Sequence, residues 1–176
     1  MKQLIYLLSI LAFSITAAQE NKTSIPIPMK NGIVFYESTI AVDKSISKEK
    51  RIARAEKWLK SAFPDSKEKT VINKEPDKIL STGIFKVITD DAADHFYWIK
   101  TDVAILLLGD SCTLQFYNYY EKPIMPGVTN DYSKIEYRWW DFRKGKPWNL
   151  EDAALFKGLN HLSLELIHSF TFYMKK

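Results

Sequence analysis

The stretch FYWIKTDVAILLLGDSCTLQF, residues 96–116, decides the fold class. Two strand-like runs flank the turn Gly109-Asp110, and on the second run Cys112, Leu114 and Phe116 alternate with polar residues. Alternation with a period of two is typical of a strand with one buried face. Because a short turn joins the two runs, they predict an antiparallel hairpin.

Further elements are predicted on both sides of this hairpin. Ser47 and Asn149 are suited to cap helices, since an apolar stripe with helical spacing follows each of them. Near the middle of an irregular stretch, alternating residues around Tyr137 indicate an additional strand over 134–140. Besides this strand, the complete set of predicted elements is five strands, over 32–42, 70–74, 79–88, 96–108 and 112–117, and two helices, over 47–62 and 149–176.

This order, β-α-β-β-β-β-α, predicts an α+β domain in which two helices pack on one face of an antiparallel sheet of about five strands. Gly83, inside a predicted strand, indicates a bulge or the close approach of a neighbour. The length of 176 residues, with 46% hydrophobic and 26% charged residues, is typical of a globular chain and excludes a disordered or fibrous one. A single cysteine, Cys112, excludes an intramolecular disulfide and a cysteine-based zinc cluster.

Residues 1–18 have the pattern of a secretory signal peptide. Lys2 precedes an apolar run that is too short to span a membrane, and small residues follow it. We therefore expect cleavage, an extended leader over 19–31 and one domain over 32–176, exported to the periplasm or beyond without a transmembrane anchor. The formal net charge of +4 is spread among interspersed charges of both signs, so a nucleic acid is not the expected partner.

Several short motifs stand out: Gly32-Ile33-Val34-Phe35-Tyr36, Val42-Asp43, Ser47-Lys48, Arg54-Ala55-Glu56-Lys57-Trp58-Leu59, Ala62-Phe63 and Lys78-Ile79-Leu80-Ser81-Thr82-Gly83. With these motifs, the sequence resembles a known bacterial family of exported domains of unknown function. That family is assigned a fold like that of the TATA-box-binding protein (TBP). The resemblance covers residues 32–88 and implies a TBP-like fold and no established activity; because a fold does not fix a function, it implies no DNA binding.

The most distinctive stretch, residues 137–148, combines aromatic and basic side chains. Such combinations serve ligand stacking, sugar platforms and protein interfaces. Neighbouring tryptophans cannot both face inward on one strand, so part of this stretch is expected at a surface. The alternative is a strand with one face in the core and the other shielding the sheet. The predicted ligand-binding residues are Tyr137, Arg138, Trp139, Trp140, Arg143 and Trp148, and the strand tyrosines Tyr117, Tyr119 and Tyr120 are candidates for the same surface.

Three side chains of the last predicted helix, His161, Glu165 and His168, cluster on one side of it and are a candidate zinc or transition-metal site. The alternative is a solvated polar face, since they lie away from the apolar stripe. Cys112 is predicted to be a buried, inert thiol rather than a nucleophile.

Three aspartates at 90, 91 and 94 lack the ligand spacing of an EF-hand loop. We therefore predict a solvated hairpin turn there rather than a calcium site.

The sequence contains no G-x-S-x-G, H-E-x-x-H, P-loop or G-x-G-x-x-G motif. It therefore favours a non-enzymatic, exported binding or interaction module of the cell envelope that needs no cofactor and uses an aromatic-basic surface. Its expected partner is an envelope protein or a small ligand. The alternative is a metal-dependent hydrolase centred on the C-terminal helix, and a purely structural role in envelope assembly is not distinguished from binding by sequence.

Overall fold

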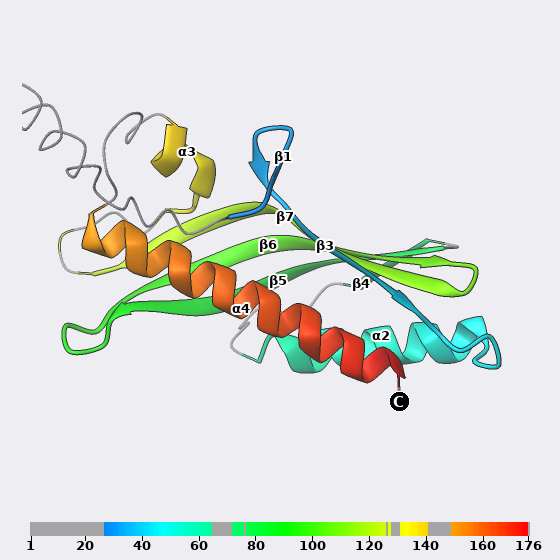
Figure 1. Cartoon of the computed structure of the whole chain (residues 1–176). Coiled ribbons are helices and arrows are strands. Elements are labelled where there is room, and N and C mark those ends of the chain that lie inside the picture. The colour runs from blue at the N-terminus through cyan, green and yellow to red at the C-terminus, as the bar shows by residue number, and fades with distance from the viewer. Residues whose placement is uncertain are drawn as a thin grey trace, which may run out of the picture.

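The computed structural model describes residues 27–64, 72–75, 77–125, 127, 131–140 and 149–175. The predicted signal peptide, residues 1–18, lies outside the described residues. The helices and strands, in chain order, are β1 (Met29–Lys30), β2 (Ile33–Val34), β3 (Tyr36–Ala41), α2 (Lys48–Ala62), β4 (Ile72–Glu75), β5 (Lys78–Asp90), β6 (His95–Leu108), β7 (Ser111–Ile124), β8 (Ser133–Lys134), α3 (Ile135–Trp140) and α4 (Leu150–Lys175) (Figure 1).

The main sheet has the strand order β3-β7-β6-β5-β4, with β8 paired to β7, and every neighbouring pair is antiparallel. The long helices α2 and α4 contact each other and lie on the same face of this sheet (Figure 1). The predicted α+β class, with two helices on one face of an antiparallel sheet, is confirmed. The strand count is slightly higher than expected, because β1 and β2 form a separate hairpin and β8 adds a short edge.

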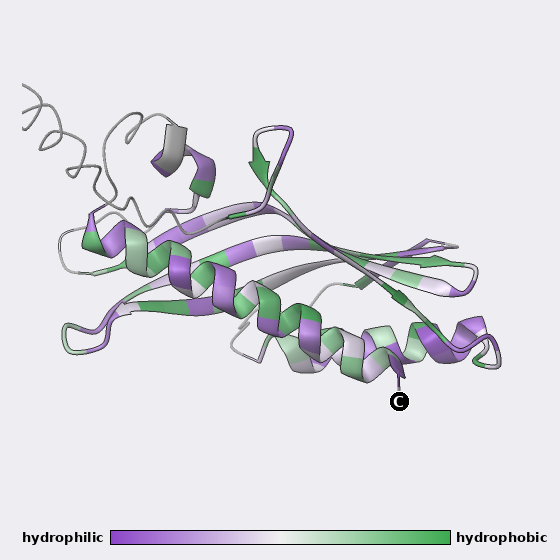
Figure 2. Ribbon diagram, viewed as in Figure 1, coloured by the Kyte–Doolittle hydropathy of each residue, from purple (hydrophilic) through white to green (hydrophobic). Residues whose placement is uncertain are grey.

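Both predicted helix caps are present. The side chain of Ser47 accepts a hydrogen bond from the Lys50 backbone nitrogen at 3.3 Å, and Asn149 Oδ1 accepts one from the Asp152 nitrogen at 2.7 Å. These oxygens satisfy backbone donors that have no partner within the first turn of a helix. Helix α4 carries hydrophobic and hydrophilic residues along its length (Figure 2), and within the described residues no helix is long and apolar enough to cross a membrane.

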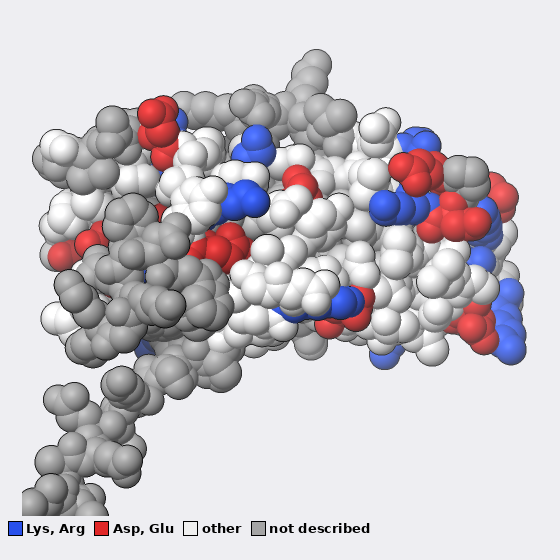
Figure 3. Space-filling model, turned by 90° about the horizontal axis from the view of Figure 1, so that it is seen from above, with Lys and Arg blue, Asp and Glu red and all other residues white. Residues whose placement is uncertain are grey.

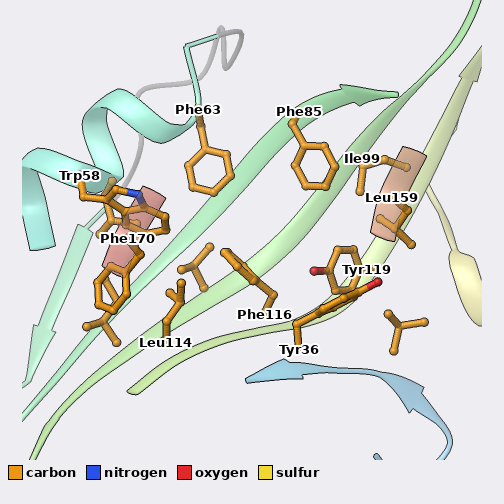
Figure 4. Packing of buried hydrophobic residues seen from close by; sticks show 14 of the residues in the cluster. Tyr36, Trp58, Phe63, Phe85, Ile99, Leu114, Phe116, Tyr119, Leu159 and Phe170 are labelled. Atoms are coloured by element: carbon orange, nitrogen blue, oxygen red, sulfur yellow. The ribbon is translucent and has the colours of Figure 1, made fainter. Parts of the chain in front are cut away.

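The core lies between the sheet and the two long helices. Trp58 of α2 packs edge-to-face on Phe170 of α4, with ring centroids 5.1 Å apart, and also contacts Phe116 of β7 (Figure 4). Gly83 of β5 lies directly under the Phe63 ring, and a methyl group there would collide with that ring. This close approach is one of the two predicted reasons for a glycine inside the strand.

Two predicted strands are wrong in detail. The strand expected over 32–42 is interrupted at Phe35, because its first part, β2, pairs with β1 across the turn at Asn31 and Gly32, whereas β3 pairs with β7 from Tyr36 onward. Strand β1 also takes up the end of the expected leader. Residues 135–140, expected within a strand over 134–140, form helix α3 instead. Ile135 and Arg138 both point into the protein, whereas residues three apart in a regular strand would point to opposite faces.

Strand β7 is longer than predicted because it contains a β-bulge. Asn118 has a φ of +53°, and the pairing with β6 shifts between Lys100 and Asp102. An extra residue in one strand changes which side chains face the core. Phe116 and Tyr119 therefore both point inward although they are three positions apart.

Candidate functional site

The residues predicted to bind a ligand do not all fall within the described chain. Arg143 and Trp148 lie outside the described residues, and Trp139 and Trp140 are described only as the backbone of α3. The Tyr137 side chain is 49% exposed. Arg138 is the residue of this group whose side-chain contacts define its role.

Arg138 points inward and joins three elements. Its Nε donates to Glu121 Oε1 of β7 and its Nη1 to Asp152 Oδ1 of α4, both at 2.8 Å, while Nη2 donates to the Tyr97 hydroxyl at 3.1 Å. The Tyr97 hydroxyl in turn donates to Glu151. Arg138 therefore ties α3 to the sheet and to the start of α4, and ligand binding by its guanidinium would have to break these bonds.

Burial dominates the electrostatics of this network. Glu121 and Asp152 are only 5% and 0% exposed. Burial raises the pKa of Glu121 above its ordinary value, and Arg138 only partly offsets that rise. For Arg138 itself, burial is the largest single effect and disfavours the charge, but the hydrogen bonds and charges of Glu121, Asp152 and Tyr97 together outweigh it and hold the pKa of the guanidinium above its usual range. A buried charge of this kind is stable only while its partners stay in place.

The metal candidates lie on an exposed face of α4. His161 Nε2 and Glu165 Oε1 are 3.4 Å apart, both side chains are exposed, and His168 is exposed as well. Across the described ranges, no group of three or more His, Cys, Asp or Glu side chains is placed to hold a metal ion. The metal site stays a prediction.

The expectation for Cys112 is met: the side chain is fully buried, and burial raises the pKa of its thiol, which disfavours a nucleophilic role. The three aspartates sit around the turn between β5 and β6, as predicted. There the Ala93 nitrogen donates to Asp90 Oδ1 at 3.2 Å, and Asp94 has a φ of +52°.

Another surface emerges from the pairing of the strands. Directly opposed residues of antiparallel strands point to the same face. In one row, Lys86 of β5, Trp98 of β6 and Lys122 of β7 lie side by side. In the next row, Lys100 of β6 is followed by Tyr120 of β7 and Lys134 of β8. We call the surface formed by these six residues, together with the neighbouring rings Phe96 and Tyr132, the lysine–aromatic face.

The lysine–aromatic face is the side of the sheet opposite α2 and α4. The flanking residues Tyr97, Ile99, Tyr119 and Glu121 are buried on the helix side, whereas the residues of the two rows alternate with them and are half-buried. Of the three strand tyrosines, Tyr119 is therefore a core residue, and its hydroxyl lies 3.1 Å from Ser163 Oγ. Tyr117 and Tyr120 belong to the opposite side of the sheet.

Aromatic rings hold three of the four lysines. Lys86 Nζ lies 3.8 Å from the centroid of the Phe96 ring, and the Lys100 and Lys122 Nζ atoms lie 5.8 and 5.7 Å from that of Tyr132. These distances are within the range of cation–π attraction. Two ammonium groups thus converge on the single ring of Tyr132.

The four lysines of this face include Lys100, which has Asp102 beside it on the same side of β6. Within the described part of the chain, none of the four forms an ion pair with a carboxylate. Asp102, one row further along β6, instead accepts a hydrogen bond from Asn118 at 2.8 Å. At the end of the molecule where α2 begins, by contrast, acidic and basic side chains gather together (Figure 3), as in the pair formed by Lys48 and Asp77.

The sequence matches no protein-family model and no curated protein. Among solved structures, the chain is similar to the crystal structure of a TBP-like protein from Parabacteroides distasonis, with a TM-score of 0.58 and 18% identity over 82% of this chain and 96% of that one. This chain has a TBP-like fold. A DUF4468 family protein from Bacteroides ovatus is also similar, with a TM-score of 0.54 and 13% identity over 84% of this chain and 85% of that one. The predicted resemblance to a TBP-like family of unknown function is thus supported, and at these identities the likeness concerns the fold.

The lysine–aromatic face was missed in the sequence because its residues come from four strands. One signal was present: Trp98 and Lys100 alternate with the apolar positions of a strand that is otherwise strongly hydrophobic. A lysine on the outer face of a central strand indicates that this face meets water or a charged partner. Only the register shows that further lysines line up beside it.

Proposed function

We propose that this protein is a non-enzymatic binding module of the cell envelope and that it binds a negatively charged partner through the lysine–aromatic face. The observation that carries this proposal is the pairing register, which sets two Lys-aromatic-Lys rows next to each other. The signal-peptide pattern of residues 1–18 supports a location in the envelope. The absence of a catalytic motif in the sequence supports binding rather than catalysis.

The lysine–aromatic face favours the binding of anions because four positively charged lysines lie close together on it. Lys100 and Lys122 are diagonal neighbours on adjacent strands, where the α-carbons are about 7 Å apart, and we take this as the scale for the separation of their charges. Two unit charges at that distance repel each other by about 0.6 kcal/mol in bulk water and about 2 kcal/mol at the effective dielectric of a protein surface. A partner with negative groups removes this repulsion and gains attraction from both lysines.

Retention on a heparin column tests the proposal, since heparin presents dense negative charge. The variant K100A/K122A removes two charges from the lysine–aromatic face, and K57A/K60A removes two from the exposed side of α2. We expect K100A/K122A to elute at clearly lower salt than the wild type and K57A/K60A to elute close to it. Equal shifts for both variants would mean that retention follows net charge alone, and the proposal would be wrong.

The stretch 137–148 stays a second candidate surface. In the described part of this stretch, the aromatic side chain of Tyr137 is exposed. The variant Y137A on the same column shows whether this stretch contributes: reduced retention would extend the binding surface to α3.

A further inference from the structure

We infer that the partner of the lysine–aromatic face is an acidic polysaccharide whose sugar rings carry carboxylates and lie across the strands. This inference rests on the proposed function and names the class of ligand. It follows from the spacing of the charges, from the rings between them and from the position of the face within the sheet.

The spacing of the lysines fits a ligand whose charges lie on either side of a ring with one apolar face. Lys86 and Lys122 are two strands apart, about 10 Å, with Trp98 between them. Lys100 and Lys134 repeat this distance around Tyr120. In a polysaccharide, the C–H face of a sugar ring can pack on an aromatic side chain while the carboxylates of flanking rings reach the lysines on either side.

An acidic peptide fits this face less well. An extended peptide presents side chains on one side every two residues, about 6.7 Å, which is close to the diagonal spacing of Lys100 and Lys122 but shorter than the spacing of about 10 Å between the two lysines of each row. Peptides that add to a sheet gain main-chain hydrogen bonds at its edge. Here β6, which carries Trp98 and Lys100, is paired on both sides along these rows, so a peptide on the face would find no free backbone groups on that strand.

A nucleic acid and an anionic membrane fit less well for different reasons. Single-stranded nucleic acids stack their bases on open ring faces. The Phe96 ring already carries the Lys86 ammonium, and two lysines approach Tyr132, so in the described part of this face successive bases would find rings without a lysine at Trp98 and Tyr120 alone. An anionic membrane would be repelled by the exposed aspartates of the β5–β6 turn, at residues 90, 91 and 94, which lie at the end of the sheet near Lys86 and Phe96.

Tyr132 marks the centre of the predicted anion subsite. It comes from the segment before β8, and Lys100 and Lys122 approach its ring from two neighbouring strands. A carboxylate bound here would meet two ammonium groups at once. Trp98 lies directly opposite Lys122 and two residues before Lys100 on β6. It would receive the adjacent sugar ring.

Isothermal titration of the full chain with three probes tests the inference: oligogalacturonate, polyglutamate and oligodeoxythymidylate. We expect oligogalacturonate to bind most tightly. K122A should weaken its binding about tenfold, the value of roughly one charge-assisted hydrogen bond. W98A should weaken it several-fold, whereas the surface control K57A should leave it unchanged. Thermal unfolding of each variant identifies any loss that is due to misfolding.

The outcomes separate the ligand class from the proposed function. If polyglutamate binds as tightly as oligogalacturonate and depends on Lys122 in the same way, the face recognises charge alone; the polysaccharide inference fails and the proposed function stands. Tighter binding of oligodeoxythymidylate would point to a nucleic acid and also overturn the inference. If no probe binds and K100A/K122A behaves like its control on heparin, both proposals are wrong.

Discussion

Replacing Arg138 by methionine removes the guanidinium that lies between two buried carboxylates and keeps much of the side chain's apolar length. In the wild type, Arg138 donates to Glu121 and Asp152 at 2.8 Å each, and these acids are 5% and 0% exposed. Breaking a buried ion pair by removing one partner costs about 3–5 kcal/mol, because the remaining charge has lost its compensation. We expect R138M to lose stability in this range at pH 7.

Urea unfolding followed by circular dichroism measures this loss. For a chain of this size, with a urea dependence of about 2 kcal/mol per molar, the midpoint should fall by about 1.5–2.5 M. The double variant R138M/E121Q should recover part of the loss, since it removes one of the two uncompensated charges. A loss below about 1 kcal/mol for R138M, or no recovery in the double variant, would show that Arg138 does not compensate these carboxylates, and the network would not stabilise α3.

Three further predictions concern single positions. Burial raises the pKa of Glu121, so the folded state binds the carboxyl proton more tightly than the unfolded state does. The contribution of Glu121 to stability therefore falls as pH rises from the ordinary carboxyl range through the raised pKa. The variant E121Q should lack this fall in stability, and a pH profile of stability equal to that of the wild type would contradict the raised pKa of Glu121. G83A should cost about 1–3 kcal/mol by overpacking against Phe63, and F63L should relieve it in a double variant. N149A should cost about 1 kcal/mol in urea unfolding through the loss of the α4 cap, whereas N149D should cost little.

Local patterns predicted most of the fold. The alternation of Cys112, Leu114 and Phe116 placed the central hairpin, and Ser47 and Asn149 marked the starts of the long helices. These features depend on residues that are close in the chain, so a sequence displays them directly.

Helix α3 could not be predicted in the same way because distant residues determine it. The Glu136 carboxylate accepts a hydrogen bond from the Val34 backbone nitrogen at 2.8 Å, and Arg138 reaches Glu121 and Asp152. In a strand, Ile135 and Arg138 would point to opposite faces. The alternating pattern of residues 134–140 carried no information about these contacts, which favour the helix.

The candidate site depends on one feature that sequence periodicity conceals, the bulge at Asn118. If β7 continued the parity of Phe116 without interruption, Tyr120 and Lys122 would point into the core beneath α4, and Tyr119 and Glu121 would point outward. The extra residue reverses this: Tyr119 enters the core, and Tyr120 and Lys122 join the open side of the sheet. The same step places Glu121 where Arg138 can reach it. One bulge therefore creates both the buried network that holds α3 and the lysine–aromatic face.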